Sequence, residues 1–281
     1  MPTALKIVAT PLGNIRDISL RAQAEIAQAD VIFAEDTRHT LKLTQALGIA
    51  LKPDCRLLSC DAHKEVGRID VVLEFLRANR KVILVSDAGC PAISDPGSLL
   101  VQGVIEHGFH VEVIPGPSAI TAAIMGAGLD TTRFAFLGFL PKKKSARKSL
   151  ITDSYKVGLA LVIYESPHRI SDLLGELFSY LGPKRVVVGR ELTKMYETFH
   201  RGKLGAALSP PIVDKGECVV VVDAGNIPSD HEEEHGDLDA FISAQLQAGH
   251  SAKDVAQEMA LKFSMKKKDA YQRVLASLGK I

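Results

Sequence analysis

Short apolar runs rich in β-branched residues alternate along the chain with longer stretches in which apolar residues recur at helical spacing. The runs lie at residues 5–9, 31–34, 81–85, 111–114, 134–140, 158–164, 185–189 and 217–223. The stretches between them, such as 20–29 and 68–78, read as amphipathic helices. This alternation predicts an α/β fold with largely parallel sheets.

Changes in composition divide the chain. Residues 141–148 (PKKKSARK) form a basic segment between two predicted strands, and we place a domain boundary before it. This predicts a first α/β domain at 1–118 and a second at 119–225. Residues 226–237 are rich in acids and turn formers and read as a linker. Three short helices, 238–246, 251–263 and 266–278, then predict a helix-turn-helix-like module at 238–281.

Three loops share one design, in which a predicted strand runs into small residues and proline before a helix. They are SDAGCPAISDPG (86–97), PGPS (115–118) and ESP (165–167). We expect Ser94 or Asp95, beside Pro96, and Ser166, beside Pro167, to cap the helices that follow. Each loop alone is an ordinary strand-to-helix connection. Three together, at the carboxyl ends of strands, predict a ligand cleft built from backbone groups.

The type of ligand follows from what these loops offer. The chain has no G-x-x-x-x-G-K-[ST] motif, and the loop after the first strand (TPLGN, 10–14) lacks a G-x-G-x-x-G fingerprint, so a phosphate cradle is poorly supported. Backbone groups, small residues and the carboxylate of Asp87 suit a ligand with an amino-acid end, a neutral adenosine and a positive centre, as a sulfonium has. The residues alone therefore indicate an α/β enzyme with a backbone-lined cleft.

Charge and cysteine content narrow the class of protein. The formal net charge is only +1, so any nucleic-acid surface must be local. The four cysteines show no C-x-x-C spacing, which argues against a zinc site or a disulfide framework and favours reduced cysteines in a cytoplasmic protein. No signal peptide and no apolar run of about 18 residues is evident, so we expect no membrane association.

One short motif is misleading. Residues 231–235 (HEEEH) satisfy the H-E-x-x-H zinc signature, but acids and turn formers surround them. A zinc-binding helix needs an apolar face to bury, so this segment reads as a solvated linker. We expect no metal.

Eight motifs together resemble a known family. They are IVATPLGN (7–14), AEDTR (34–38), LVSDAGCPAISDPG (84–97), VIPGPSA (113–119), GFLP (138–141), YESPHRI (164–170), GRELTK (189–194) and KGECVVVV (215–222). Their order and spacing are similar to those of the small-subunit ribosomal RNA methyltransferase I family, in the tetrapyrrole methylase superfamily. The resemblance covers nearly the whole chain. It implies two α/β domains of tetrapyrrole-methylase type with S-adenosylmethionine in the cleft between them, a homodimer, and 2′-O-methylation of a cytidine ribose in the decoding region of small-subunit (16S) rRNA.

The resemblance also implies cofactor contacts where the motifs align. These fall on Pro11, Asp87, Ala88, Gly89, Ala92, Ile93, Ser118, Ala119, Glu165, Ser166 and Leu192. The chain departs from the family at Cys90, where threonine is usual. We expect packing to survive this change and any hydroxyl hydrogen bond to weaken, whereas a reactive thiol there is a less favoured alternative.

Polar residues in the AEDTR and GRELTK motifs are candidates for the chemistry. Methyl transfer to a hydroxyl needs a proton acceptor and near-attack geometry. We assign these roles to Glu191, as the base, with Asp36 and Arg38; Arg38 or Lys194 would hold flanking phosphates. The alternative, that these residues simply pair with one another, is equally compatible with the sequence.

Basic residues beside the predicted cleft are candidates for RNA binding, although a charge run is usually only a solvated surface. They are Lys142, Lys143, Lys144, Arg147, Lys148, Arg169 and Lys194. Two other functions stay open, a small-molecule tetrapyrrole methylase and a helix-turn-helix regulator that binds nucleic acid. The sequence does not distinguish naked rRNA from the assembled small subunit as substrate.

Overall fold

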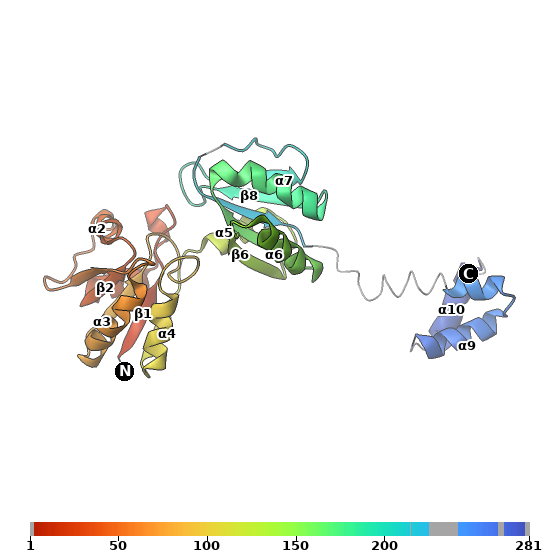
Figure 1. The fold of residues 1–281 in the computed structure, drawn as a ribbon, viewed down its shortest axis with the longest axis horizontal. Helices are drawn as coiled ribbons and strands as arrows, with labels where there is room; N and C mark the ends of the chain where they lie inside the picture. The colour runs from red at the N-terminus through yellow and green to blue at the C-terminus, as the bar shows by residue number, and fades with distance from the viewer. Residues whose placement is uncertain (1–2, 214, 225–240, 264–266, 279–281) are drawn as a thin grey trace. The chain divides into compact units, whose positions relative to one another are not determined.

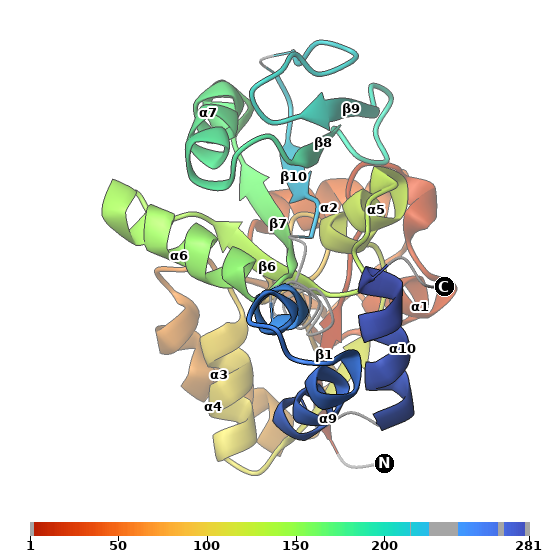
Figure 2. The same cartoon turned by 90° about the vertical axis from the view of Figure 1, so that its right-hand side faces the viewer.

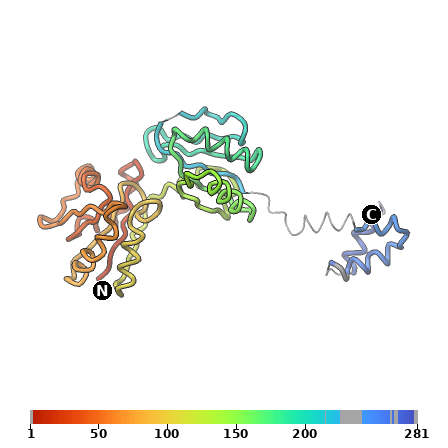
Figure 3. Tube along the Cα trace, in the orientation of Figure 1, coloured from red at the N-terminus to blue at the C-terminus, as the bar shows by residue number. Residues whose placement is uncertain are grey.

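The computed structural model describes residues 3–213, 215–224, 241–263 and 267–278. The chain divides into two compact units, Met1–Gly225 and Asn226–Ile281. The first unit holds two five-stranded sheets, and Figure 3 follows the chain from the last strand of the first sheet into the second.

The first sheet is entirely parallel. Its strand order is β3-β2-β4-β1-β5, with β1 at Ala4–Val8, β2 at Val31–Ala34, β3 at Arg56–Ser59, β4 at Val82–Val85 and β5 at His110–Ile114. The apolar runs of β2 and β4 are buried throughout because helices cover both faces of the sheet.

Alternate residues of each strand enter different cores. On one face, Leu5, Phe33 and Leu84 pack with α3 (Glu65–Arg77) and α4 (Ser98–Glu106), which lie side by side in Figure 1. On the other, Ile32 and Ile83 pack with α1 (Leu20–Gln28). The 3-10 turn η1 (Ile15–Asp17) precedes α1, and α2 (Thr37–Ala46) follows β2.

The second sheet is mostly antiparallel. Its order is β6-β7-β10-β8-β9, with β6 at Phe134–Phe139, β7 at Ala160–Glu165, β8 at Arg185–Arg190, β9 at Thr198–Lys203 and β10 at Cys218–Val222. Only β6 and β7 pair in parallel, because the chain returns after β9 and inserts β10 between β7 and β8 in the opposite direction. The expectation of largely parallel sheets is therefore wrong for this sheet.

Helices cover both faces of the second sheet as well. Figure 2 shows α5 (Ala119–Ala127) on one side and α6 (Lys144–Lys156) and α7 (Ile170–Leu181) on the other. Val162 and Val221 pack under α5, while their neighbours Leu161 and Val220 pack under α6 and α7. The 3-10 turn η2 (Pro167–Arg169) leads directly into α7.

The start of α4 corrects one prediction. Neither Ser94 nor Asp95 caps this helix, whose N-cap is Gly97 with φ 132°. The buried carboxylate of Glu65, on α3, instead accepts hydrogen bonds from the backbone N–H groups of Gly97, Leu99 and Leu100 at 3.0, 2.6 and 3.0 Å. Similarly, Ser166 makes no side-chain cap at η2. The free N–H groups of α4 are satisfied from a distant helix rather than locally.

The second unit is helical where it is described. Residues 241–247 form a helix, followed by α9 (Ala252–Lys262) and α10 (Lys267–Ser277) around a core that includes Ile242, Met259 and Val274. Ser251 caps α9 by accepting a hydrogen bond from the backbone N–H of Asp254. The predicted linker at 226–237, with its HEEEH motif, lies outside the described residues.

Candidate functional site

A cavity of about 470 Å³ lies between the two sheets of the first unit. Eight of the eleven predicted cofactor residues line it: Asp87, Ala88, Gly89, Ile93, Ser118, Ala119, Glu165 and Ser166. All three predicted loops therefore meet at one place, because the strands before them end at this edge of their sheets. Pro11, Ala92 and Leu192 do not line the cavity; Leu192 is buried in the core beneath α5.

The loop at 86–97 has an unusual backbone. Gly89 (φ 78°) exchanges two hydrogen bonds with Thr10, at 2.8 and 3.1 Å, which ties this loop to the loop after β1. Ala92 and Ser94 also have positive φ, at 67° and 63°, a conformation that L-residues seldom adopt. Such strain persists only where the surroundings impose it, and it is frequent at ligand sites.

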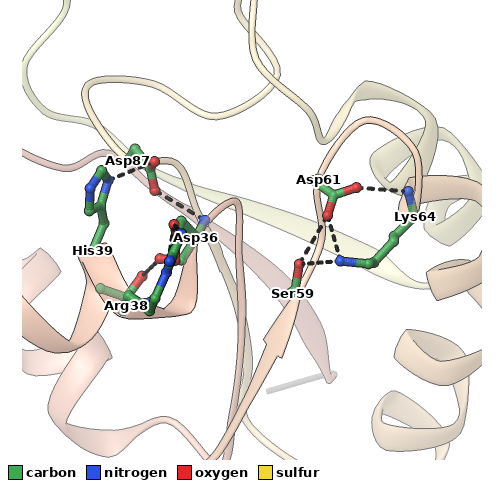
Figure 4. A network of polar contacts seen from close by, with 8 residues as sticks. Asp36, Arg38, His39, Ser59, Asp61, Lys64 and Asp87 are labelled. Atoms are coloured by element: carbon green, nitrogen blue, oxygen red, sulfur yellow. Dashed lines mark hydrogen bonds and ion pairs between the residues drawn. The ribbon is translucent and has the colours of Figure 1, made fainter.

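Asp87 is held in the cavity wall by the start of α2. Its Oδ1 accepts from the backbone N–H of Asp36 at 3.1 Å, and its Oδ2 lies 2.8 Å from His39 Nδ1 (Figure 4). Asp36 itself caps α2 and binds the guanidinium of Arg38, which lowers the pKa of the Asp36 carboxyl. Neither Asp36 nor Arg38 lines the cavity, so this part of the AEDTR motif supports Asp87.

The cavity is acidic. Five of its lining residues are carboxylates, namely Glu35, Asp87, Asp95, Glu165 and Glu217, and none is Lys, Arg or His. Burial raises the pKa of Glu35, and burial together with the nearby charge of Glu35 raises the pKa of Asp95 to about 6. An environment of this kind repels phosphate groups and stabilises a cation.

The remaining lining suits the other parts of S-adenosylmethionine. Leu12, Ile93, Phe139 and Val219 supply apolar surface for a neutral adenosine, and the small residues Gly89 and Ala119 leave backbone groups accessible. The cavity volume is typical of small-molecule sites. The lining therefore offers carboxylates to the sulfonium and the ammonium and apolar surface to the adenine base, and it contains no phosphate-binding group. These residues fit S-adenosylmethionine.

Cys90 also lines the cavity. Its half-buried thiol donates a hydrogen bond to the backbone carbonyl of Pro117, with Sγ 3.3 Å from the oxygen. Burial and the charge of Asp95 raise the pKa of this thiol. The thiol is therefore a weak nucleophile at neutral pH and joins two of the cavity loops, which favours the packing interpretation over the reactive one.

Glu191 lies outside the cavity lining. Its carboxylate accepts from Lys194 Nζ at 3.0 Å and from the backbone N–H of Glu217 at 2.9 Å. Burial alone would raise the pKa of Glu191, but these hydrogen bonds outweigh it and hold the pKa below its usual value. The group is an ionised anchor that joins the 191–197 loop to the segment carrying Gly216 and Glu217, both of which line the cavity.

The seven residues predicted to bind RNA do not all lie together. Lys142, Lys144, Arg147 and Arg169 line a second cavity of about 570 Å³. Lys143 is the exposed N-cap of α6, and the ammonium of Lys148 lies over the ring of Tyr180, 5.6 Å from its centroid. Lys194 is bound to Glu191 and Glu217.

Sequence reasoning missed several cavity residues. They are Leu12, Glu35, Asp95, Phe139, Tyr164, Gly216, Glu217 and Val219, among others. All eight lie inside the motifs quoted in the sequence analysis, so membership of a motif was the available signal. Within the described ranges no group of His, Cys, Asp and Glu could hold a metal ion, and no helix there is long and apolar enough to cross a membrane.

Comparison with known proteins first establishes the class. The family model for tetrapyrrole (corrin/porphyrin) methylases matches residues 4–208. Among solved structures, the methyltransferase CobJ aligns with a TM-score of 0.61 at 20% identity, over 79% of this chain and 94% of that one. The cobalt precorrin-4 methyltransferase CbiF aligns with a TM-score of 0.55 at 18% identity, over 79% and 95%. These similarities define a methyltransferase of tetrapyrrole-methylase fold.

Curated relatives narrow the class further. Proteins called ribosomal RNA small subunit methyltransferase I are 37% identical in Halalkalibacterium halodurans, over 95% of this chain and 93% of the relative, and 42% identical in Xylella fastidiosa, over 79% and 81%. The Thermotoga maritima protein of that name is 40% identical, over 73% and 90%. The chain belongs to the ribosomal RNA small subunit methyltransferase I family.

Proposed function

We propose that this protein transfers a methyl group from S-adenosylmethionine to the 2′-hydroxyl of a cytidine in the decoding region of small-subunit 16S rRNA. The observation that carries the proposal is the acidic, backbone-lined cavity between the sheets, in a chain whose near-full-length relatives are called rRNA methyltransferases. The methyltransferases CobJ and CbiF share the fold at 18–20% identity and support the fold alone.

The cofactor would be held by the three loops. The space available to it is surrounded by Asp87, Ala88, Gly89, Cys90, Ile93, Ser118, Ala119, Glu165 and Ser166, with Glu35, Asp95 and Glu217 contributing negative charge. When bound, S-adenosylmethionine supplies an electrophilic methyl group. The protein must then orient the ribose hydroxyl and accept its proton.

Asp95 is a better candidate than Glu191 for the proton acceptor. Asp95 lines the cavity, and its pKa of about 6 lies near neutral pH, where a general base is most effective. Glu191 is engaged by Lys194 and by the backbone of Glu217. We propose that Asp95 accepts the proton and that Glu191 positions the 191–197 loop.

Two isosteric variants test this division of roles. Asp95→Asn should lower kcat by about 100-fold or more and remove the limb of the pH–rate profile near pH 6. Its Kd for the cofactor should rise much less than kcat falls, because the other four carboxylates of the cavity lining remain. Glu191→Gln should retain that limb. Near-normal turnover by Asp95→Asn, or loss of the limb in Glu191→Gln, would refute the assignment.

The substrate is tested by a direct comparison. The protein is incubated with methyl-labelled S-adenosylmethionine and with assembled small subunits, naked rRNA or a reduced tetrapyrrole. We expect label in an alkali-stable 2′-O-methylcytidine dinucleotide from the decoding region, with assembled subunits preferred. Label in the tetrapyrrole would support the small-molecule alternative. Nucleic-acid binding without any transfer would support the regulator alternative.

Two further parts of the proposal follow from the family. We propose a homodimer, testable by light scattering at micromolar concentration. We also propose a cytoplasmic location, because the proposed substrate is ribosomal RNA.

A further inference from the structure

A second cavity adjoins the proposed cofactor site. It lies between the first turns of α6 and the start of α7, and Glu165 lines both cavities. Within this cavity, Lys142 and Lys144 come from one side and Arg169 from the other. The two cavities differ sharply in charge, because the first has five carboxylates and no basic lining residue, whereas the second has four basic residues.

Two carboxylates of the second cavity are already neutralised. Arg147 binds Glu176 through two hydrogen bonds of 2.6 Å, and its third nitrogen donates to the backbone carbonyls of Pro141 and Lys142. Arg169 pairs with Glu165 at 2.5 and 2.8 Å. Arg147 is therefore fully used in joining α6 to α7, so we do not assign it to RNA. We also leave out Lys143 and Lys148, which do not line the cavity.

Lys142 and Lys144 remain available. Neither ammonium forms a hydrogen bond or ion pair with any residue that the structure describes. Asp172 is the remaining carboxylate, so the cavity keeps a net positive charge, with four basic residues against three acidic ones. The net positive charge of the cavity suits one anionic group.

The placement of these lysines opposes helix stability. The N-cap of α6, Lys143, makes no capping hydrogen bond, and the first turn contains no acidic residue. Basic residues at this end interact unfavourably with the helix dipole, while an anion near the free N–H groups is favoured. A bound anion would remove both penalties.

We propose that this second cavity binds a phosphodiester group of the RNA strand that carries the target nucleotide, through Lys142, Lys144 and the exposed side of Arg169. The inference rests on the proposed function. The acidic cofactor cavity repels the RNA backbone, so the strand needs an anchor close by. Glu165 and Arg169, paired at the boundary, separate the site for a cation from the site for an anion.

A pair of double variants tests the proposal in the full-length protein. Lys142→Ala/Lys144→Ala removes the two available cavity lysines. Lys143→Ala/Lys148→Ala removes the same charge from the same run but from residues outside the cavity lining. All four side chains are exposed, so both proteins should fold, as thermal unfolding will verify.

Methyl transfer to assembled small subunits gives the first readout. For Lys142→Ala/Lys144→Ala we expect KM for the subunit to rise at least tenfold, with kcat and the Kd for S-adenosylmethionine within about twofold of wild type. The control pair should change KM by less than threefold. Equal effects in the two pairs would show that only overall charge matters and would overturn the proposal.

Equilibrium binding gives a readout that does not depend on methyl transfer. The probe is a fluorescent single-stranded oligoribonucleotide of decoding-region sequence, titrated at several KCl concentrations. The slope of log K against log salt should become shallower by about 0.7 in the cavity variant, since the cavity binds one phosphate and each phosphate contact in a single strand contributes about 0.7. An unchanged slope would contradict the proposal. If wild type binds the probe through these lysines yet methylates no RNA, the proposed function fails and the anion site stands.

Discussion

Asp95 is the residue whose ionisation should be most visible in the stability of the fold. Its pKa rises from 3.8 to about 6 on folding, so between about pH 4 and pH 6 the folded state binds the proton more tightly than the unfolded chain. The unfolding free energy contributed by this group is therefore fully present below pH 4 and is lost as pH rises through 6. The full shift corresponds to about 3 kcal/mol, and solvent screening of the half-buried carboxyl reduces it to about 1 kcal/mol.

Asp95→Asn should make this visible, since asparagine resembles the protonated acid at every pH. We expect the variant to gain about 1 kcal/mol relative to wild type between pH 4 and pH 7, measured by urea unfolding followed by circular dichroism. A difference that stays constant with pH would contradict the raised pKa. Glu191→Gln provides a contrast, because the pKa of Glu191 is lowered and its stabilising effect is lost at acid pH.

Individual site residues could be predicted from the sequence only where a strand pattern and a loop motif together place them at the predicted cleft. Asp87 and Ser118 lie in recognisable loops that follow β4 and β5, so the strand pattern places them at the predicted cleft. Glu35 and Glu217 lie far apart in the chain and meet only through the packing of two sheets. Glu191 is the opposite case, because its residue type suits a base whereas its hydrogen bonds to Lys194 and to the backbone of Glu217 favour a positioning role.

At the scale of elements, the cap on α4 links stability to the site. Glu65→Ala would leave three backbone N–H groups of a partly buried helix end without an acceptor. We expect a loss of about 2–4 kcal/mol in unfolding free energy, because unsatisfied buried donors cost more than a surface cap. Cofactor affinity should fall too, since the residues before Gly97 line the cavity.

Glu65→Gln is the matched control. The amide keeps an oxygen acceptor but loses the charge that favours the helix N-terminus, so its unfolding midpoint should fall between those of wild type and Glu65→Ala. Urea unfolding and cofactor titration measure the two effects. A Glu65→Ala protein as stable as wild type would show that water replaces the carboxylate at no cost.

The strands could be predicted where the signal for them lies in the local sequence. All eight apolar runs of the sequence are strands, whereas the apolar pattern does not predict β3 and β9. β3 has only four residues, and β9 carries polar side chains (TFHRGK); both lie at sheet edges, where burial imposes no apolar pattern. Strand direction in the second sheet was wrong because it depends on where β10 inserts, which no local signal records.

For the whole molecule, the division into two units has a measurable consequence. The four cores of the first unit contain only its own residues, and the helical unit has a separate core around Val255 and Met259. A chain of residues 1–225 should therefore fold and bind S-adenosylmethionine with a Kd within about threefold of the full chain, by isothermal titration. A truncated chain that fails to fold would show that the units depend on each other.

The central position of β10 also bears on how the protein is made. This strand, the last of the first unit, lies between β7 and β8, and the residues just before it complete the wall of the proposed cofactor cavity. While the chain emerges from the ribosome, the first sheet can form early from its own sequential strands. The second sheet has a gap at its middle until residue 222 has emerged. A nascent chain short of that point lacks one wall of the proposed cofactor cavity, so we expect it to bind no cofactor until β10 is in place.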